Sequence, residues 1–182
     1  MKKKMLLHIC CAPCLIMPYS HLKEKFEITG FWFNHNIHPV TEYYARQKSV
    51  KDLCKSEGIE LIKHGKYGLR DFIKKAVFAE NRRCFICYYD RLDITAEYAK
   101  AHHFDCFSTT LLYSKRQKHD LLPEIGLALA NKHGIDFYYE DFRVYWAEGR
   151  EISLQQNYYR QKYCGCIFSE MERYLGKEPE NM

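Results

Sequence analysis

Residues 4–14 read Lys-Met-Leu-Leu-His-Ile-Cys-Cys-Ala-Pro-Cys. Residues 4–10 are a short apolar run typical of a buried strand, and residues 14–25 have the pattern of a short helix. A phosphate-binding turn at this place would contain glycines, so that backbone amides could face an anion. This turn has no glycine and Pro13 has no amide hydrogen, so nucleotide binding is not expected here. Soft sulfur ligands stand there instead, at Cys10, Cys11 and Cys14.

The same alternation of strands and helices continues along the chain. Further strands are predicted over residues 26–34, 59–63, 104–109 and 135–139. Helices are predicted over residues 40–57, 70–79, 85–103 and 117–133, and later over 150–162 and 167–175. This order predicts an α/β fold with an open, Rossmann-like parallel sheet of about five strands and extra C-terminal helices. Such sheets bind ligands beyond the carboxyl ends of the strands, where strand order reverses, and the first strand ends at Cys10-Cys11.

Length and composition bound the kind of protein. The chain has 182 residues, which suits a single domain over residues 1–182. The apolar stretch after the N-terminal lysines is too short for a signal peptide, and no window is long enough to span a membrane. We therefore expect a cytoplasmic protein without a membrane partner, whose cysteine groups are metal-binding or catalytic rather than structural disulfides. The net charge of +5 permits a polyanionic partner without establishing one.

Six of the nine cysteines fall into three tight groups. Two of these groups, Cys10-Cys11 and Cys84-Cys87, together offer four soft ligands, which suit tetrahedral zinc or a [4Fe–4S] cluster. Adjacent cysteines chelate a single ion poorly because successive side chains diverge, so the first pair favours a cluster. The sequence leaves three readings for Cys14: a thiol beside the ligands, a ligand of another metal, or the buried start of a helix.

The third group is Cys164-Gly165-Cys166. Two cysteines around one glycine can close a small disulfide ring, and glycine supplies the backbone freedom that the ring needs. Such a ring is strained and easily reduced, which favours a redox-active dithiol over a structural bridge. The alternatives are two more metal ligands or an incidental pair. Cys54 and Cys106 stand alone in apolar patterns and are expected in the core.

Five segments together resemble one family. They are His8-Ile-Cys-Cys-Ala-Pro-Cys14, Asn36-Ile-His-Pro39 with Glu42-Tyr43, Arg83-Cys-Phe-Ile-Cys-Tyr-Tyr-Asp-Arg-Leu92, Phe107-Ser-Thr-Thr-Leu-Leu112, and Tyr159-Arg-Gln-Lys-Tyr-Cys-Gly-Cys166. The chain resembles the cobalamin-independent epoxyqueuosine reductase (QueH) family from about residue 5 to residue 170. The three cysteine motifs are specific in combination, although each alone is not. One departure stands at Ser114-Lys115-Arg116-Gln117, where the resemblance leads us to expect Ser-Pro-Tyr-Gln.

The resemblance implies a fold, a cofactor and a reaction. The sheet would be of the adenine-nucleotide α-hydrolase (HUP-like) type, in a single iron–sulfur reductase domain. The reaction would be the two-electron deoxygenation of epoxyqueuosine to queuosine at the tRNA wobble position, the last step of queuosine biosynthesis. Cys164 and Cys166 would form a redox-active disulfide. The [4Fe–4S] cluster would be held by Cys10, Cys11, Cys84 and Cys87. An additional iron ion is left open, with Cys14, histidines and carboxylates as its candidate ligands.

Further roles are expected on the same hypothesis. The partner is the anticodon loop of a tRNA carrying epoxyqueuosine, together with an electron donor that the sequence does not identify. An anticodon loop is single-stranded, so its wobble base can be splayed out and stacked at low cost. The candidate proton donors are Tyr163, Asp141 and His8. The candidate phosphate contacts are Lys115, Arg116 and Lys118, whose alternative is the solvated start of a helix.

A second hypothesis comes from another functional class. The same thiols could hold zinc and stabilise a tRNA-binding module that has no redox activity. A brown protein that contains iron supports the reductase, and a colourless protein with stoichiometric zinc supports the module.

Overall fold

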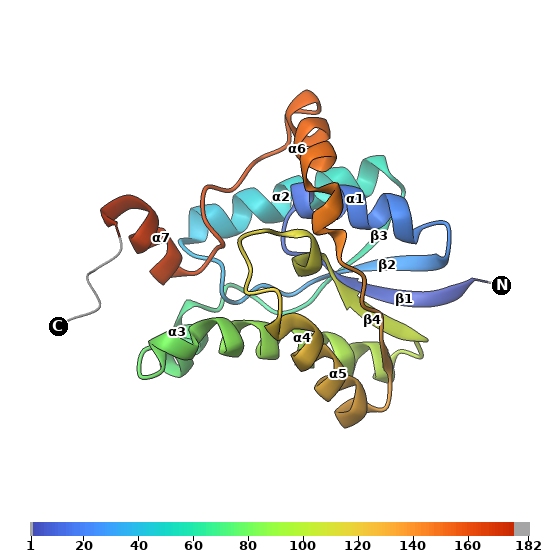
Figure 1. The fold of residues 1–182 in the computed structure, drawn as a ribbon, viewed down its shortest axis with the longest axis horizontal. Helices are drawn as coiled ribbons and strands as arrows, with labels where there is room; N and C mark the ends of the chain where they lie inside the picture. Colours follow the sequence, from blue (N-terminus) through green and yellow to red (C-terminus); the bar gives the residue numbers. More distant parts are fainter. Residues whose placement is uncertain (1, 177–182) are drawn as a thin grey trace.

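The computed structural model describes residues 2–176, which contain one five-stranded sheet (Figure 1). Its strands are β1 (Lys3–His8), β2 (Phe26–Trp32), β3 (Glu60–Lys63), β4 (Cys106–Thr109) and β5 (Asp136–Phe137). All neighbours are parallel, in the order β3-β2-β1-β4-β5. The predicted α/β class with an open, Rossmann-like parallel sheet is confirmed. Residues 1 and 177–182 of the predicted domain lie outside the described residues.

Helices cover both faces of the sheet, as buried parallel strands require. One face carries α1 (Ala12–Leu22) and α2 (Val40–Ser56) (Figure 1). The opposite face carries α3 (Leu69–Ala76), α4 (Arg83–Ala101) and α5 (Leu121–His133). Two C-terminal helices follow, α6 (Trp146–Gln155), which packs against α1, and α7 (Ile167–Leu175), which lies beyond the carboxyl edge of the sheet. The extra C-terminal helices are therefore present as predicted.

The central strand β1 is fixed by neighbours on both sides. It pairs with β2 from Lys3 to His8 and with β4 from Met5 to His8. The side chains of Met5, Leu6 and Leu7 are fully buried. Burying each such side chain contributes about 1.5–3 kcal/mol to the stability of the fold. The strand that precedes the cysteine turn is therefore firmly packed.

Strand order reverses at β1. The chain runs from β1 outward to β2 and β3, and then returns to place β4 and β5 on the other side of β1. The crevice at the carboxyl ends of β1 and β4 is therefore the point where an open α/β sheet binds ligands. Cys10-Cys11 follow β1 after one residue, Ile9, and Thr110 follows β4 directly. The first cysteine group lies at the predicted position.

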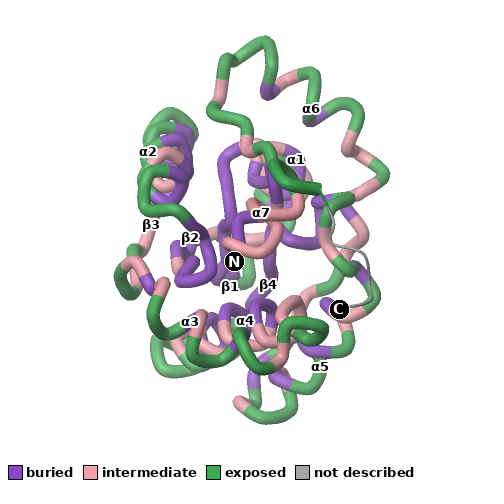
Figure 2. Tube along the Cα trace, turned by 90° about the vertical axis from the view of Figure 1, so that its left-hand side faces the viewer, coloured by how far each residue is buried: buried purple, intermediate pink, exposed green. Residues whose placement is uncertain are grey.

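The carboxyl edge of the sheet is overhung by later parts of the chain. Viewed toward this edge, α7 lies in front of the ends of β1 and β4 (Figure 2). The strands behind it are largely buried, whereas α6 and α7 are largely half-buried or exposed. Within residues 2–176, no helix combines the length and the apolar character needed to cross a membrane.

The structure differs from the sequence predictions near the C-terminus. The helix predicted over residues 150–162 begins earlier, at Trp146, and ends at Gln155. Asn157 then takes a positive φ of 53°, and residues 158–166 form no helix. The backbone of this segment is bonded to other parts of the chain, as described below, and a helical pattern in the sequence does not reveal that. The strand predicted over residues 135–139 is also shorter, because only Asp136 and Phe137 pair with β4.

Candidate thiol-rich active site

The candidate site begins in the crevice between β1 and β4. The Oγ1 of Thr110 accepts the amide N–H of Cys10 at 3.1 Å and lies 3.4 Å from the Sγ of the same cysteine. At the ends of the two strands, His8 Nδ1 and Thr109 Oγ1 are 2.9 Å apart. These contacts tie the cysteine turn to the neighbouring strand and give its thiols a defined position.

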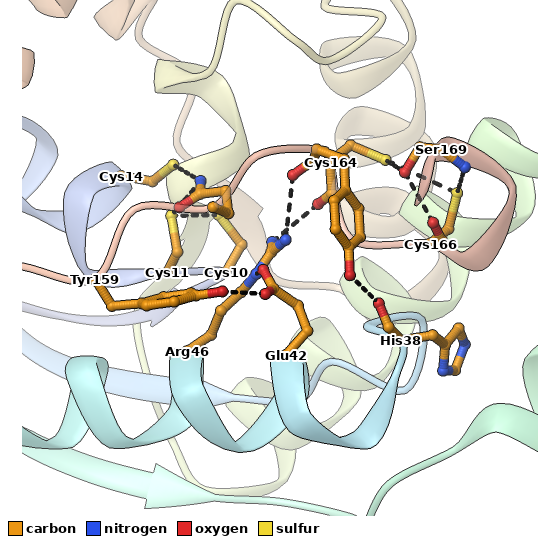
Figure 3. Close-up of polar contacts among 12 residues, drawn as sticks. Cys10, Cys11, Cys14, His38, Glu42, Arg46, Tyr159, Cys164, Cys166 and Ser169 are labelled. Carbon is orange, nitrogen blue, oxygen red and sulfur yellow. Dashed lines mark hydrogen bonds and ion pairs between the residues drawn. The ribbon is translucent and has the colours of Figure 1, made fainter. Parts of the chain in front are cut away.

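Three thiols meet in this crevice. The Sγ atoms of Cys10, Cys11 and Cys14 lie within 4.8 Å of one another, and all three residues are buried (Figure 3). Gln161 donates from Nε2 to the Sγ of Cys11 at 3.0 Å and lies 3.7 Å from that of Cys14. Hydrogen bonding from Cys11 and Cys14 holds the pKa of Cys10 well below its usual range, and Thr110 adds to this effect. A buried set of three soft donors that contains a stabilised thiolate can hold a metal.

The second cysteine pair lies in the first turns of α4. Cys84 and Cys87 are one turn apart, and Arg91 lies one turn further along. Arg91 donates to the Sγ of Cys87 at 3.0 Å and to its carbonyl oxygen at 3.1 Å. Burial raises the pKa of Cys87 to about 12, and the charge of Arg91 opposes that rise. Although burial disfavours the charge of Arg91, Cys87 and Cys10 keep its pKa above the usual value, so this guanidinium faces both groups of thiols.

The two groups do not converge on a single point. Within residues 2–176, the only set of three or more Cys, His or carboxylate ligand atoms packed within 4.8 Å of one another is Cys10, Cys11 and Cys14. Cys84 and Cys87 lie outside this set. A single ion draws its ligands to one point, whereas a cluster spreads them over several metal atoms.

The third group, Cys164 and Cys166, immediately precedes α7 (Figure 3). The two Sγ atoms are 3.8 Å apart, and both residues are free thiols. Cys166 is the N-cap of α7, and its Sγ accepts the amide N–H of Ser169 at 3.4 Å. The hydroxyl of Ser169 lies 2.9 Å from the Sγ of Cys164. Both sulfurs therefore lie at the amino end of a helix, where thiolates are stabilised.

The two thiols of this pair differ in acidity. A hydrogen bond from Cys166 lowers the pKa of Cys164 to about 5 despite burial, and Ser169 contributes in the same direction. The same bond raises the pKa of Cys166. Near neutral pH one sulfur is a thiolate and the other keeps its proton. This arrangement suits a dithiol that is oxidised and reduced repeatedly.

A cavity of about 500 Å³ opens beside this pair. Cys84, Cys164 and Cys166 line it, so it joins the second and third cysteine groups. The other charged residues on its wall are five cations and one carboxylate: Arg83, Arg116, Lys118, Lys162, Arg173 and Glu172. A smaller cavity of about 90 Å³ reaches Cys14 and shares Arg116 with the larger one. Both cavities beside the thiols therefore have cationic side chains on their walls, and Arg116 belongs to both.

Two of the three predicted phosphate contacts line the large cavity. They are Arg116 and Lys118. The third, Lys115, places its Nζ 4.8 Å from the centre of the Trp146 ring, which is a cation–π contact. The segment that departs from the family pattern thus contributes Arg116 to the cavity and Lys115 to packing against α6, and Lys118 follows directly after it.

The three predicted proton donors have different surroundings. Tyr163 lines the large cavity, where its hydroxyl donates to the carbonyl of His38 and burial raises its pKa. Asp141 binds Arg143 through both carboxylate oxygens, at 2.8 and 2.6 Å, which lowers the pKa of Asp141 to about 2. Burial lowers the pKa of His8 to about 3. At neutral pH Asp141 is ionised and His8 is neutral, and of the three only Tyr163 lines the cavity beside the dithiol.

Three polar residues at the thiols were not singled out from the sequence. Gln161 contacts Cys11, Arg91 contacts Cys87, and Arg46 of α2 bonds the backbone of Cys164. Arg46 is 1% exposed and Arg91 is 2% exposed. An arginine buried this deeply is rare unless its charge is paired. The four-residue spacing of Glu42 and Arg46 on a helix indicates an ion pair. An ion pair exposed to solvent has the same spacing, so the spacing alone does not predict that this pair is buried.

The fold and these thiols define a Rossmann-like α/β protein with a cysteine-rich metal or redox site at the reversal point of its sheet. A family model described as "Epoxyqueuosine reductase QueH" matches residues 5–172. The chain belongs to this QueH family.

Relatives that bear the family's name match nearly the whole chain. A protein named epoxyqueuosine reductase QueH from Dehalococcoides mccartyi is 37% identical over 175 residues, which cover 96% of this chain and 96% of the relative. A protein of the same name from Thermotoga maritima is 33% identical over 92% of this chain and 91% of its own length. The Helicobacter pylori relative is 36% identical over 91% of this chain but is longer, so that the match covers 49% of it.

Proposed function

We propose that this chain is an epoxyqueuosine reductase, an oxidoreductase that converts epoxyqueuosine to queuosine at the wobble position of tRNA as the last step of queuosine biosynthesis. Family membership supports this proposal, and one structural observation carries it. Cys84, Cys164 and Cys166, which are distant in sequence, line one cationic cavity, and Cys10, Cys11 and Cys14 meet in the crevice at the carboxyl edge of the sheet. We place residues 1–182 in a single reductase domain that acts in the cytoplasm, with an electron donor of unidentified kind.

The cofactor that we propose is a [4Fe–4S] cluster. Its proposed ligands are Cys10, Cys11, Cys84 and Cys87. This donor set fits, because it offers soft sulfur, because burial excludes water from three of the four, and because the charge of Arg91 faces two of them. Cys14, which lies among Cys10 and Cys11, is the proposed ligand of an additional iron ion. A bound cluster supplies electrons one at a time.

The proposed catalytic pair is Cys164 and Cys166. Removing the oxygen of an epoxide as water, to leave a double bond, consumes two electrons and two protons. A dithiol that closes to a disulfide releases two electrons and two protons, so one ring closure balances one deoxygenation. The donor then reopens the ring with two electrons and two protons. Tyr163 is the proposed proton-transfer residue on the cavity wall, whereas Asp141 is ionised at neutral pH and does not line this cavity.

The cationic cavity is the proposed entrance for the RNA. Arginine and lysine side chains on its wall suit phosphate groups, and an anticodon loop can present its wobble base splayed out from the stack. Arg116 lies where the two cavities meet, so it is well placed to hold the phosphate next to that base. The base would then face the Cys164–Cys166 pair.

The decisive experiment is an anaerobic assay on tRNA that carries epoxyqueuosine, with iron and zinc measured in the same sample. We expect queuosine in the product RNA and iron in the protein. A colourless protein that contains stoichiometric zinc and binds tRNA without converting it supports the zinc-stabilised binding module instead.

The dithiol is tested separately by Cys164→Ser. We expect turnover to be lost while the iron content stays at the wild-type value. Cys54→Ala is the control, since this cysteine is buried near the end of α2 and belongs to none of the three groups. Full turnover by Cys164→Ser would exclude the dithiol role.

A further inference from the structure

One side chain holds the backbone on both sides of the first redox cysteine. Arg46 of α2 donates from Nη1 to the carbonyl oxygen of Cys164 at 3.0 Å and from Nη2 to that of Tyr163 at 3.1 Å (Figure 3). These are charge-assisted bonds to two consecutive carbonyls, and a planar guanidinium makes them as a pair. They fix the direction in which the chain enters the Cys164–Cys166 loop.

Arg46 is itself fixed by an anchored carboxylate. Its Nε donates to the Oε1 of Glu42 at 2.7 Å, one turn earlier in α2, and the other carboxylate oxygen accepts the hydroxyl of Tyr159. Arg46 is 1% exposed and Glu42 is 7% exposed. Both charges are therefore removed from water and depend on this geometry. Because Tyr159 belongs to the C-terminal segment, α2 holds that segment at two places.

A third contact secures the middle of the loop. The amide N–H of His38 donates to the carbonyl oxygen of Gly165 at 2.7 Å. Gly165 has a φ of 133°, a region that favours glycine, and a Cβ built there would lie 3.2 Å from Arg46 Nη1. The three carbonyls from Tyr163 to Gly165 are thus all bonded to residues outside the loop.

We propose that Arg46 is a positioning residue for the redox pair, and that its bonds to the carbonyls of Tyr163 and Cys164 hold the two sulfurs near one another for ring closure. This inference rests on the proposed dithiol function. A free Cys-Gly-Cys segment samples many conformations in which its sulfurs point apart, and closing the ring then costs the entropy of ordering it. In the structure that ordering is complete before the bond forms, with the sulfurs 3.8 Å apart.

The conservative test is Arg46→Lys. Lysine keeps the positive charge, which also faces Cys11 and Cys10, but cannot reach two carbonyls and Glu42 together. A neutral substitution would destabilise the thiolates, which favours the disulfide. It would also disorder the loop, which disfavours the disulfide. Arg46→Lys therefore isolates the positioning effect.

The measurement is the equilibrium between Cys164–Cys166 and glutathione. The anaerobic metal-containing protein is equilibrated at a series of glutathione ratios, and the disulfide fraction is read by thiol alkylation and mass spectrometry of the Cys164 peptide. We expect Arg46→Lys to lower the equilibrium constant for ring closure at least about tenfold, which corresponds to a potential about 30 mV less negative. Iron content and the iron–sulfur spectrum should match the wild type.

A matched control lies on the same helix. Lys48 and Asp52 form an exposed ion pair with the same four-residue spacing as Glu42 and Arg46, at 2.6 Å. Asp52→Asn breaks that pair on the solvated face and should leave ring closure unchanged. Tyr159→Phe loosens Glu42 without touching Arg46 and should shift the constant in the same direction as Arg46→Lys, but less.

The outcomes separate this inference from the proposed function. If the wild type forms no ring at any glutathione ratio, the dithiol role itself is wrong. If the wild type forms the ring and Arg46→Lys has the same constant, Arg46 does not position it, even if the variant melts at a lower temperature. Should Arg46→Lys fail to fold, Tyr159→Phe decides by the same measurement, and an unchanged constant there overturns the inference.

Discussion

The guanidinium of Arg91 donates to the Sγ of Cys87 from 3.0 Å away, in the interior of the protein. Among residues 2–176, no carboxylate forms an ion pair with Arg91. A buried cation without a carboxylate needs another anion. Of the two sulfurs that act on it most strongly, Cys10 is the one whose pKa is held low enough to supply an anion, whereas burial raises the pKa of Cys87 to about 12. The charge of Arg91 opposes the effect of burial on the pKa of Cys87 and so favours its thiolate, which is the form of cysteine that binds metals.

Replacing this cation should weaken metal retention. Arg91→Met keeps much of the side-chain volume but removes the charge and the bond to Cys87. Losing a partner that hydrogen-bonds a metal ligand lowers affinity by about 10- to 100-fold, so we expect the variant to release iron to a chelator at correspondingly lower chelator concentrations. Arg82→Met is the control, since Arg82 is exposed at the start of the same helix. Iron retention equal to the wild type in folded Arg91→Met would contradict this role.

The acidity of Cys164 predicts an unusual pH profile of reactivity. Only the thiolate reacts with alkylating agents, and the thiolate fraction rises as pH passes the pKa. With a pKa of about 5, Cys164 should react at a rate that rises near pH 5 and is flat above pH 7. An ordinary thiol would still gain reactivity up to about pH 8.5.

Ser169 supplies the control for this profile. Alkylation of the reduced, anaerobic protein is followed by mass spectrometry of the Cys164 peptide. Ser169→Ala removes a hydroxyl that lies 2.9 Å from the sulfur, so its profile should move to higher pH. A wild-type rate that climbs steeply above pH 7 is the result that this prediction forbids.

Two glycines provide a matched test of the loop. Gly165→Ala introduces a Cβ at a φ of 133°, with Arg46 Nη1 and Ile37 Cγ1 each 3.2 Å away. Gly58→Ala introduces one at a φ of 68°, with no heavy atom within 4 Å. Both should lower the free energy of unfolding through backbone strain, by about 1–2 kcal/mol for Gly58.

Gly165→Ala should cost more, up to about 3 kcal/mol, because the added carbon also presses on its neighbours. Denaturant unfolding measures both losses. Equal losses for the two variants would mean that the loop can move away from Arg46 without cost.

Binding of tRNA should depend on salt through the cationic cavity. Each phosphate contact releases counterions, so removing one contact should reduce the slope of log affinity against log salt by about one. We expect this change for Arg116→Ala and for Lys118→Ala, measured by titration of tRNA at several salt concentrations. Lys48→Ala, on the exposed face of α2, should leave the slope unchanged. An affinity that does not weaken as salt rises would show that this cavity does not meet phosphates.

The fold could be predicted because its signals are local. The apolar run of β1 and the helix that starts after Pro39 each show their structure within a few residues. The position of Cys10-Cys11 then followed from a general rule about parallel sheets. The segment over residues 158–166 could not be predicted in this way, because carbonyls there bond Arg46 and an amide of a distant loop.

The sequence singled out the cysteines of the candidate site but not the arginines that contact them. Short cysteine spacings are rare, so Cys84-Cys87 and Cys164-Cys166 stand out in a sequence. Arginine is common on surfaces, and nothing next to Arg46 or Arg91 in sequence indicates that they are buried. Cys14 was left with three readings because its distance from Cys10 and Cys11 depends on how the first turn of α1 begins.

The sulfur of Cys166 has two neighbours at once, the Cys164 thiol and the amide of Ser169 in the first turn of α7. We expect ring closure, which draws this sulfur toward Cys164, to loosen its bond to the Ser169 amide, and a helix that loses its N-cap is weakened by about 1 kcal/mol. The stability of α7, the last helix within residues 2–176, should therefore report the redox state of the pair. Hydrogen exchange along α7 should quicken when the ring is closed and slow again when it is opened.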